Sequence, residues 1–359
     1  MKDNIFVPNY RITSSMKRRI KEIEDNSWLI ENMLLMPKHE AWIRRQVSVR
    51  RAVGTTRIEG ATLDEEAVDD LIRKGRVGKL SDDQQANLNA INAYEFIDYL
   101  SDQDDIPIDE LVIRQINREL LRGASEILTP GIYRKGENKV GDYIPPNQGD
   151  VPALMRSFAL WLRSNDKSHP IVKAGIAHIH LVAIHPFWDG NGRTARGLAT
   201  LILQRSQLSF KKLLSLEALF SSERDRYFSA IERTLGAHHR SKYDATPWLQ
   251  LFIRGLLKNS VYLKAMLTDW HRVMTRVREK FERRNLNSRQ ADGCAYAYHV
   301  GKITRPEYIE VTGASPVTSS RDLAMLVELE ILVPKGNTRA RVYYPVEELD
   351  KSERQPSTE

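Results

Sequence analysis

The sequence predicts a mainly α-helical protein, and three observations support that prediction. Apolar side chains recur every three or four residues along most of the chain, as the buried face of a helix requires. Two largely apolar runs, 171–184 and 198–203, are typical of buried helices, and a polar loop at 185–196 separates them. With 359 residues, 41% hydrophobic and 28% charged, the chain is long enough for a sizeable core in two or three modules.

Composition also limits the class of protein. The single cysteine, Cys294, excludes an internal disulfide framework and suits a reducing cytosol. The N-terminus lacks the apolar stretch of a secretory signal, and the run at 171–184 is interrupted by Lys173, His178 and His180. We therefore expect a cytoplasmic protein with no membrane segment. A net charge of +7 permits anionic partners without requiring them.

Helices are predicted throughout the first half of the chain. A capping box at Thr62–Glu65 should start the third of them. Their expected ranges are 13–35, ended by Pro37; 40–53, ended by Gly54; 63–73; 83–100; and 107–122.

The segment 131–146 changes character. It has two short β-prone runs around a polar turn, so local signals are equally consistent with a small hairpin and with a plain loop. Helices are expected again at 151–163, 169–184, 193–205, 221–235 and 246–284.

The last part of the chain is predicted to be a separate unit that follows a polar linker at 285–288. Two helices, 305–311 and 316–330, are joined by a tight turn, and two strands, 331–333 and 342–344, come after them. A helix–turn–helix followed by a hairpin is typical of a winged-helix domain.

The polar loop at 185–196 combines residue types that each suit phosphate chemistry. Its two glycines let successive backbone N–H groups turn toward an anion, and the next helix adds a positive N-terminal dipole. Asp189 is an oxygen ligand suited to Mg²⁺ shared with phosphates. Arg193 and Arg196 share a helix face and can both bind phosphate, while His185 can accept a proton near neutral pH. By contrast, His178 and His180 lie two apart on a helix, so we interpret them as packing or hydrogen-bonded residues rather than metal ligands.

The loop resembles the signature of the Fic family, His-x-Phe-x-(Asp/Glu)-Gly-Asn-Gly-Arg-x-x-Arg, and it matches every defined position. The resemblance implies a Fic-type helical bundle in which His185 is the catalytic base and Asp189 the Mg²⁺ ligand. It implies nucleotide binding by Asp189, Gly190, Asn191, Gly192, Arg193, Thr194, Ala195 and Arg196.

The resemblance extends to the segment 131–146. In the family, a hairpin called the flap lies over the active site and holds the target by β-pairing. Gly131-x-Tyr133-Arg134 with 140–146 is similar to it, which favours the hairpin over the loop. The residues thereby implied to lie beside the nucleotide are Val140, Gly141, Asp142 and Tyr143, with Tyr227 near the adenine. Some relatives carry an asparagine where this chain has Leu235, so the base is less well specified than the phosphates.

A motif upstream of the signature resembles the family's inhibitory sequence, (Ser/Thr)-x-x-x-Glu-(Gly/Asn). Here it is Thr55-x-x-x-Glu59-Gly60. The resemblance implies an N-terminal inhibitory helix in which Thr55 anchors the segment and Glu59 pairs with Arg196, blocking the γ-phosphate.

These features predict four parts. They are an N-terminal helical region, 1–102, with the inhibitory helix at about 55–60; a catalytic core, 103–240, with flap 131–146; a helical connection, 241–286; and a winged helix-turn-helix domain, 287–359.

The resemblance implies a protein adenylyltransferase that uses ATP and Mg²⁺. His185 would take the proton from a Ser, Thr or Tyr hydroxyl of a protein, which could be the chain itself, as that hydroxyl attacks the α-phosphate. Asp189 would hold Mg²⁺ between the α- and β-phosphates. The loop amides and Asn191 would cradle the phosphates, Arg193 would neutralise the β end, and Arg196 would hold the γ-phosphate.

Alternative functions stay open at this level. The same site could remove AMP, alone or as a second activity, with Glu59 orienting a water, or it could transfer another phosphate-linked group. The chain could instead be mainly a DNA-binding regulator, with a recognition helix starting at Thr318, Ser319, Ser320 and Arg321 and a wing carrying Lys335, Arg339 and Arg341. A docking or dimerisation role for this tail is favoured over DNA binding, because its basic residues are few and Asp322 and Glu328 share the helix.

Overall fold

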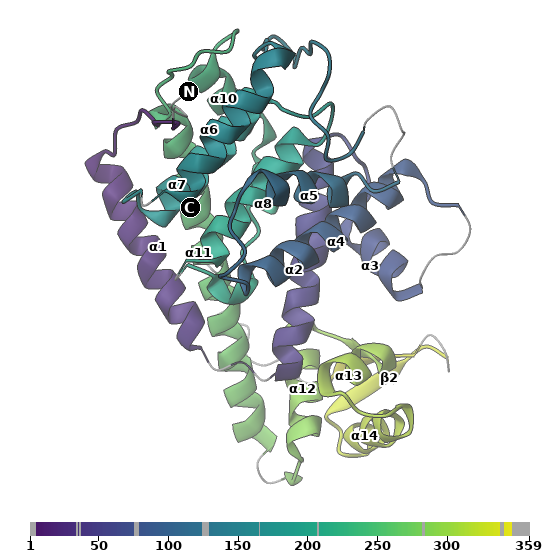
Figure 1. The fold of residues 1–359 in the computed structure, drawn as a ribbon. Helices are drawn as coiled ribbons and strands as arrows, with labels where there is room; N and C mark the ends of the chain where they lie inside the picture. The colour runs from purple at the N-terminus through teal and green to yellow at the C-terminus, as the bar shows by residue number, and fades with distance from the viewer. Residues whose placement is uncertain are drawn as a thin grey trace. The chain divides into compact units, whose positions relative to one another are not determined.

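The computed structural model describes residues 5–33, 35, 37–74, 79–123, 129–164, 166–206, 208–281, 284–337 and 341–346. The chain divides into two compact units, Met1–Glu31 with Gln46–Val261, and Asn32–Arg45 with Tyr262–Glu359. Two long helices, α2 (Pro37–Ile58) and α11 (Thr246–Phe281), each contribute to both units (Figure 1).

The first unit is built from helices, as predicted. Besides its parts of α2 and α11, it contains α1 (Ser14–Asn32), α3 (Glu65–Lys74), α4 (Asp82–Ser101), α5 (Glu110–Leu120), α6 (Val151–Arg163), α7 (Pro170–Ile184), α8 (Asn191–Gln204), α9 (Leu216–Ser222) and α10 (Arg224–Leu235). Helix α4 begins with a capping box in which the side chains of Ser81 and Gln84 each bind the other's backbone N–H.

In the core of this unit, α8 is surrounded by other helices. Helices α7 and α8 pack against each other on either side of the signature loop, and α4 and α5 pack on α8. Apolar side chains of α2, α4, α5 and α8 form one buried cluster, which includes Val53, Ile97, Ile116 and Leu201. The loop therefore connects two helices that are held in place by packing against several neighbours.

Helix α2 corrects one expected boundary, because it continues through Gly54 to Ile58. A side chain at Gly54 would place its Cβ 2.7 Å from the backbone carbon of Glu217 and 2.8 Å from the nitrogen of Ala218. Glycine stands here because α9 approaches α2 closely, and it does not end the helix. The expected motif Thr55–Glu59 therefore lies at the C-terminal end of α2.

The expected capping box at the start of α3 is also wrong. The helix begins at Glu65, and the carboxylate of Asp64 accepts the N–H of Ala67 at 2.8 Å. Thr62 binds Asp83 instead, through both its N–H and its hydroxyl.

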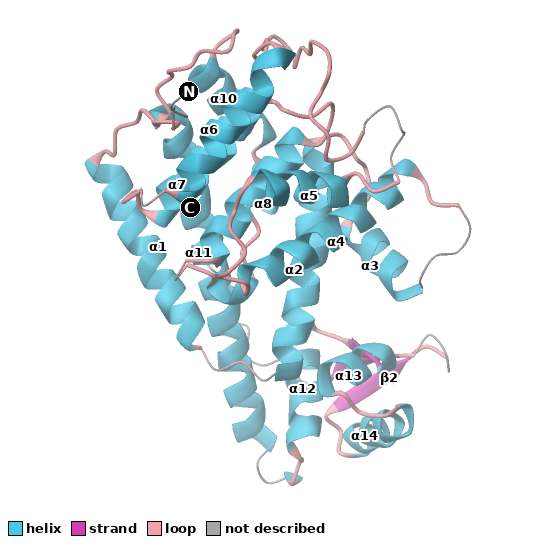
Figure 2. Cartoon of the chain, viewed as in Figure 1, coloured by secondary structure: helices cyan, strands magenta, loops and turns pink. Residues whose placement is uncertain are grey.

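The expected two-stranded flap is not a regular hairpin. Within 131–146, which the structure describes in full, the only β-type pairing is a single bridge between Val140 and Tyr143, and Ile144 bridges to His238 outside the segment. Residues 132–134 do not pair with 140–144, because Arg134 is bound to the signature loop. Figure 2 accordingly draws this segment as loop between α5 and α6.

The second unit combines helices with a small sheet. It contains α12 (Ser288–Val300), β1 (Ile303–Thr304), α13 (Arg305–Thr312), α14 (Pro316–Glu328), β2 (Leu332–Lys335) and β3 (Val342–Pro345). The strands are antiparallel in the order β1-β3-β2. The helices and strands expected at 305–344 are present, while α12 and β1 were not foreseen. Assignment of this unit as a winged helix stays a prediction, and Arg339 of the expected wing lies outside the described residues.

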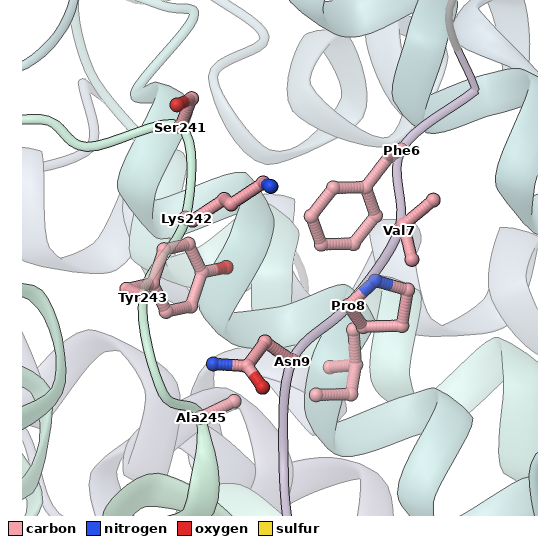
Figure 3. A pocket seen from close by; sticks show the side chains of 9 residues that line it. Phe6, Val7, Pro8, Asn9, Ser241, Lys242, Tyr243 and Ala245 are labelled. Atoms are coloured by element: carbon pink, nitrogen blue, oxygen red, sulfur yellow. The ribbon is translucent and has the colours of Figure 1, made fainter.

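The N-terminal segment is fixed on the first unit. The ring of Phe6 stacks on His180 of α7 with centroids 3.5 Å apart, and Asn9 forms a parallel bridge with Asp244. Figure 3 shows residues 6–9 facing 241–245 across a cavity of about 10 Å³, too small for a ligand. This segment therefore covers the buried His180, which also binds the Tyr243 hydroxyl at 3.0 Å.

Across the described ranges, the structure contains no helix with the length and apolar character needed to span a membrane.

Candidate functional site

The signature loop begins and ends in backbone conformations that fix it to two helices. His185 ends α7 in the left-handed region, at φ 50° and ψ 58°, and its N–H donates to the carbonyl of Leu181 at 2.9 Å. Gly190 caps α8 at φ 74°, and the first helical bond of α8 runs from Thr194 N–H to its carbonyl at 2.8 Å. Since N–H groups in the first turn of a helix have no intrahelical partner, Asn191, Gly192 and Arg193 present theirs at this end.

Asn117 of α5 is a support of the loop that sequence reasoning missed. Its amide nitrogen donates to the carbonyl of Asp189 at 3.0 Å and to the Thr194 hydroxyl at 3.2 Å. Its oxygen accepts the N–H of Gly131 at 2.9 Å. The side chain is fully buried and joins the start of α8 to the start of the flap segment. Only its polar character within an apolar helix face could have indicated it.

Arg134 is a second support. It is 2% exposed, its N–H donates to Pro186, and its guanidinium donates to the carbonyls of His185, Gly136 and Pro146. A buried cation so fully engaged holds the segment 131–146 against the loop.

Asn191 is placed differently from the expectation that its side chain cradles phosphate. Its oxygen accepts the N–H of Phe187 at 2.9 Å, and its nitrogen donates to the carbonyl of Phe187 at 2.9 Å. The buried side chain thus closes the loop on itself, and its backbone N–H is the group left for an anion. Thr194 and Ala195 are likewise fully buried, and the Thr194 hydroxyl donates to Gly190.

His185 has the electrostatics of a base that is neutral at physiological pH. Burial, together with the positive charge of Arg134, lowers its pKa to about 4, although a hydrogen bond with the backbone of Val182 and the charges of Glu59 and Asp189 act in the opposite direction. An imidazole with this pKa is ready to accept a proton at pH 7.

Asp189 and Arg193 form an ion pair at the N-terminal end of α8. The Nη2 of Arg193 lies 2.7 Å from Oδ2 of Asp189, whose other oxygen accepts the N–H of Gly190 at 2.6 Å. The Asp189 side chain is 44% exposed, so its carboxylate is accessible to solvent. The described residues contain no group of three or more metal-ligating side chains. One hard carboxylate is nevertheless what Mg²⁺ needs when phosphates supply most of its ligands, so Asp189 fits that role.

Arg196 is the most deeply buried charged residue of the site. Its side chain is fully buried, and Nη2 lies 2.9 Å from Oε1 of Glu59. The same guanidinium donates from Nη2 to the carbonyl of Thr55 at 3.1 Å and from Nε to the Thr55 hydroxyl at 3.1 Å. Burial works against the charged form, but the facing oxygens of Tyr227 and Glu59 outweigh it and raise the Arg196 pKa. The spacing Thr55–Glu59 had suggested the Glu59 contact, but not that Thr55 binds the arginine directly.

Tyr227 is buried beneath Arg196. Its hydroxyl accepts from Nη1 of Arg196 at 3.2 Å and lies 3.1 Å from Nε2 of His178. His178 stacks on Trp248 with centroids 4.4 Å apart, and burial lowers its pKa well below the usual value. The histidine is therefore neutral, as a packing residue should be. Contact of Tyr227 with a base stays a prediction, while its hydroxyl contact with Arg196 was not foreseen.

The carboxylate of Glu59 lies over the start of α8. A side chain at Gly192 would place its Cβ 2.9 Å from Oε1 of Glu59 and 3.2 Å from Nη1 of Arg196. The missing side chain therefore leaves room for an anionic oxygen beside the α8 amides, and Glu59 occupies that room. Gly60, with φ 107° and open surroundings, ends the helix behind it.

The flap residues expected beside the nucleotide lie at the surface. Val140, Gly141 and Asp142 are exposed, and Gly141 has φ 57° at the tip of the turn. Tyr143 points inward, because its hydroxyl donates to the carbonyl of Ala183, two residues before His185, at 2.7 Å. The tip is thus anchored to the helix that carries the imidazole.

The residues considered for DNA contact are only partly available. Ser320, Arg321, Lys335 and Arg341 are exposed, but Ser319 is fully buried and donates to Pro316. Asp322 is buried and paired with Arg289 at 2.6 Å. In the stretch 318–322, α14 thus has one exposed guanidinium, that of Arg321.

Comparison with known proteins places the same loop in a family. A model of the Fic/DOC family matches residues 107–203. The chain is similar to Protein adenylyltransferase Fic of Drosophila melanogaster, with 38% identity over 132 residues, and of Nematostella vectensis, with 43% identity over 105 residues. These alignments cover 36% and 29% of this chain and 26% and 24% of the relatives, so the chain spans about a quarter of the curated relatives it matches.

Solved structures share the fold. A Fic family protein from Desulfovibrio desulfuricans G20 has a TM-score of 0.62 at 22% identity, over 95% of this chain and 98% of its own. A fragment of Fic-1 from C. elegans has a TM-score of 0.57 at 22% identity, over 73% of each chain. At these identities the likeness concerns the fold.

Proposed function

The chain belongs to the Fic family, and from that premise we propose that it is a protein adenylyltransferase held inactive by Glu59. The reaction transfers AMP from ATP to a Ser, Thr or Tyr hydroxyl of a protein. The observation that carries this proposal is the arrangement of a neutral His185, the free amides of the α8 N-terminus and the buried Arg196 around one loop.

The chemistry needs little more than these groups. The target oxygen attacks the α-phosphorus, its proton passes to the His185 imidazole, and the bond to the β-phosphate oxygen breaks to release pyrophosphate. Helix amides and arginines stabilise the negative charge of the phosphates as it builds up on the leaving pyrophosphate, which is the main task of a phosphoryl-transfer site. Asp189 is the residue that would hold Mg²⁺, whose charge would neutralise the phosphate oxygens.

The position of Glu59 supports the proposal that the resting enzyme is inhibited. Glu59 occupies the guanidinium that the γ-phosphate requires and puts a negative charge beside the incoming phosphates. Because the Glu59 side chain is 41% exposed, solvent weakens the pair compared with a fully desolvated one. Arg196 also keeps its contacts with Thr55 and Tyr227 when Glu59 is removed, so the site should survive the loss.

The test is labelling with ATP that carries radioactive phosphorus in the α position. Glu59→Gly should label itself or proteins of a lysate at least tenfold faster than wild type, and Glu59→Gln should fall between them because the amide keeps the size and loses the charge. His185→Ala in the Glu59→Gly chain should abolish labelling. Label from γ-labelled ATP, or equal rates in wild type and Glu59→Gly, would contradict the proposal.

Removal of AMP is the second candidate, and the exposure of Glu59 favours it. A carboxylate that solvent reaches beside the loop can orient a water toward a phosphate. Incubation of an AMP-bearing protein with wild type and Glu59→Gly separates the two activities. Release of AMP by wild type and its loss in the variant would assign Glu59 to hydrolysis.

A further inference from the structure

A second cleft lies in the first unit, apart from the signature loop. It has a volume of about 710 Å³ and is formed by the N-terminal parts of α1 and α11 and by one face of α10. The cationic side chains that line it are Arg19, Arg226, Arg233 and Arg254, and the one acidic side chain is Asp225. The lining therefore carries a net charge of +3.

Two of these arginines have no acidic partner within the described part of the chain. Arg226 and Arg254 bind Glu223, at 3.4 and 2.5 Å. Arg233 makes a long contact to the carbonyl of Ser229, at 3.3 Å, and Arg19 is half-buried at the α1 side. Arg19 and Arg233 thus leave two guanidiniums available to an anion.

The rest of the lining also favours an anion. Helices α1 and α11 direct their positive N-terminal ends at the cleft, with Thr13 and Ser15 at one and Pro247 and Gln250 at the other. Hydroxyl and amide groups at these ends can donate hydrogen bonds.

Helix α10 separates this cleft from the catalytic loop. Ser229 and Arg233, four residues apart, line the cleft on one side of the helix. Tyr227 is turned about 200° from Ser229 at 100° per residue, and it faces Arg196. The cleft is therefore a site of its own.

We propose that this cleft binds an oligophosphate anion. All four cations are arginines, although the chain has many lysines, and the planar guanidinium fork matches phosphate oxygens. The volume suits a small ligand, and Met16 and Leu251 offer apolar contact for a part that carries no charge. The site does not depend on AMP transfer.

The probe is inorganic tripolyphosphate, titrated by calorimetry into the full chain at 50 and 200 mM salt. The Arg193→Gln protein serves as the host, because it weakens binding at the signature loop. We expect one site that weakens as salt rises. Arg19→Gln with Arg233→Gln should weaken it about 100-fold, since each lost charged contact costs about tenfold or more.

The matched control is Lys17→Gln with Arg18→Gln, which removes the same charge from exposed positions of α1 outside the cleft. Equal weakening by both double variants, or no binding at 50 mM salt, overturns the proposal. Binding of hexaglutamate as tight as tripolyphosphate overturns it in favour of an acidic peptide. Since Arg19 and Arg233 lie outside the loop, their variants in the Glu59→Gly chain should label normally, which keeps this result separate from the proposed function.

Discussion

At the scale of single residues, the site depends on a histidine that burial keeps neutral. The usual pKa of histidine, about 6.5, would leave part of the base protonated at pH 6 to 7. The pKa of about 4 for His185 removes that loss. Burial therefore extends the pH range over which the imidazole can accept a proton.

The acid limb of kcat/KM is predicted to lie well below pH 6.5. In Glu59→Gly the carboxylate that raises the His185 pKa is absent, so this limb should lie at about 4 or lower. Measurement of AMP transfer by this variant from pH 4.5 to 8 checks it. The rate should stay level down to about pH 5.5, and an inflection near 6.5 would contradict the assignment.

Tyr227 is predicted to position Arg196 for the γ-phosphate. Tyr227→Phe in the Glu59→Gly chain removes a hydrogen bond to a charged group and leaves Nε2 of His178 buried without its partner. A loss of about 1.4 kcal/mol or more corresponds to a rise of about tenfold in KM for ATP. Because His185 is untouched, kcat should change much less.

The matched control for this variant is Tyr243→Phe, which breaks a similar buried tyrosine–histidine pair at His180. It should leave the KM for ATP unchanged. An equal rise in KM in both variants would show that general loosening, rather than Arg196, is responsible.

At the scale of elements, the position of α2 depends on its contact with α9. Gly54 lies where any Cβ would come within 2.8 Å of backbone atoms of Glu217 and Ala218, which cannot yield as a flexible side chain would. Thr55 and Glu59 follow within five residues. Close packing of two helices thus holds the Glu59 carboxylate in place.

Gly54→Ala is predicted to displace α2 and loosen the Glu59–Arg196 pair. Overpacking of this kind costs about 1–3 kcal/mol, which lowers the melting temperature by roughly 2–10 °C, and self-labelling should rise toward that of Glu59→Gly. Calorimetry and α-labelled ATP measure the two effects. Gly149→Ala, at a glycine with open space around it, should change neither. A wild-type labelling rate with a lowered melting temperature would separate α2 packing from inhibition.

At the scale of the whole molecule, stability should depend on buried neutral histidines. His178 and His180 lie in the core helix α7, and burial lowers both pKa values, that of His180 to about 3. Below pH 6.5 these two histidines take up protons in the unfolded chain, whereas they stay neutral in the folded chain. The free energy of unfolding therefore falls as pH falls.

Between pH 7 and 5 the neutral His180 should cost about 2 kcal/mol, and His178 should add to this loss, in a range where most carboxylates remain ionised. We expect a clear drop in the melting temperature over this range. The drop should be smaller in His180→Gln, which has no proton to gain. A melting temperature that is constant from pH 7 to 5 would contradict this account.

The sequence by itself determined the local features. Apolar periodicity predicted α1, α6, α7 and most of α4 and α5, because side-chain spacing along one helix reports directly on its buried face. The contiguous signature at 185–196 predicted an anion site at the start of α8, since a glycine turn followed by a helix suffices to form one.

Tertiary structure decided the contacts between distant segments. Gly54 is helical because α9 lies against it, and 131–146 is not a regular hairpin because Arg134 binds the carbonyls of His185 and Pro186. Arg196 meets Thr55 across 141 positions and Tyr227 across 31. A local pattern cannot predict such partners, because only the packing of the helices determines which buried polar groups satisfy one another.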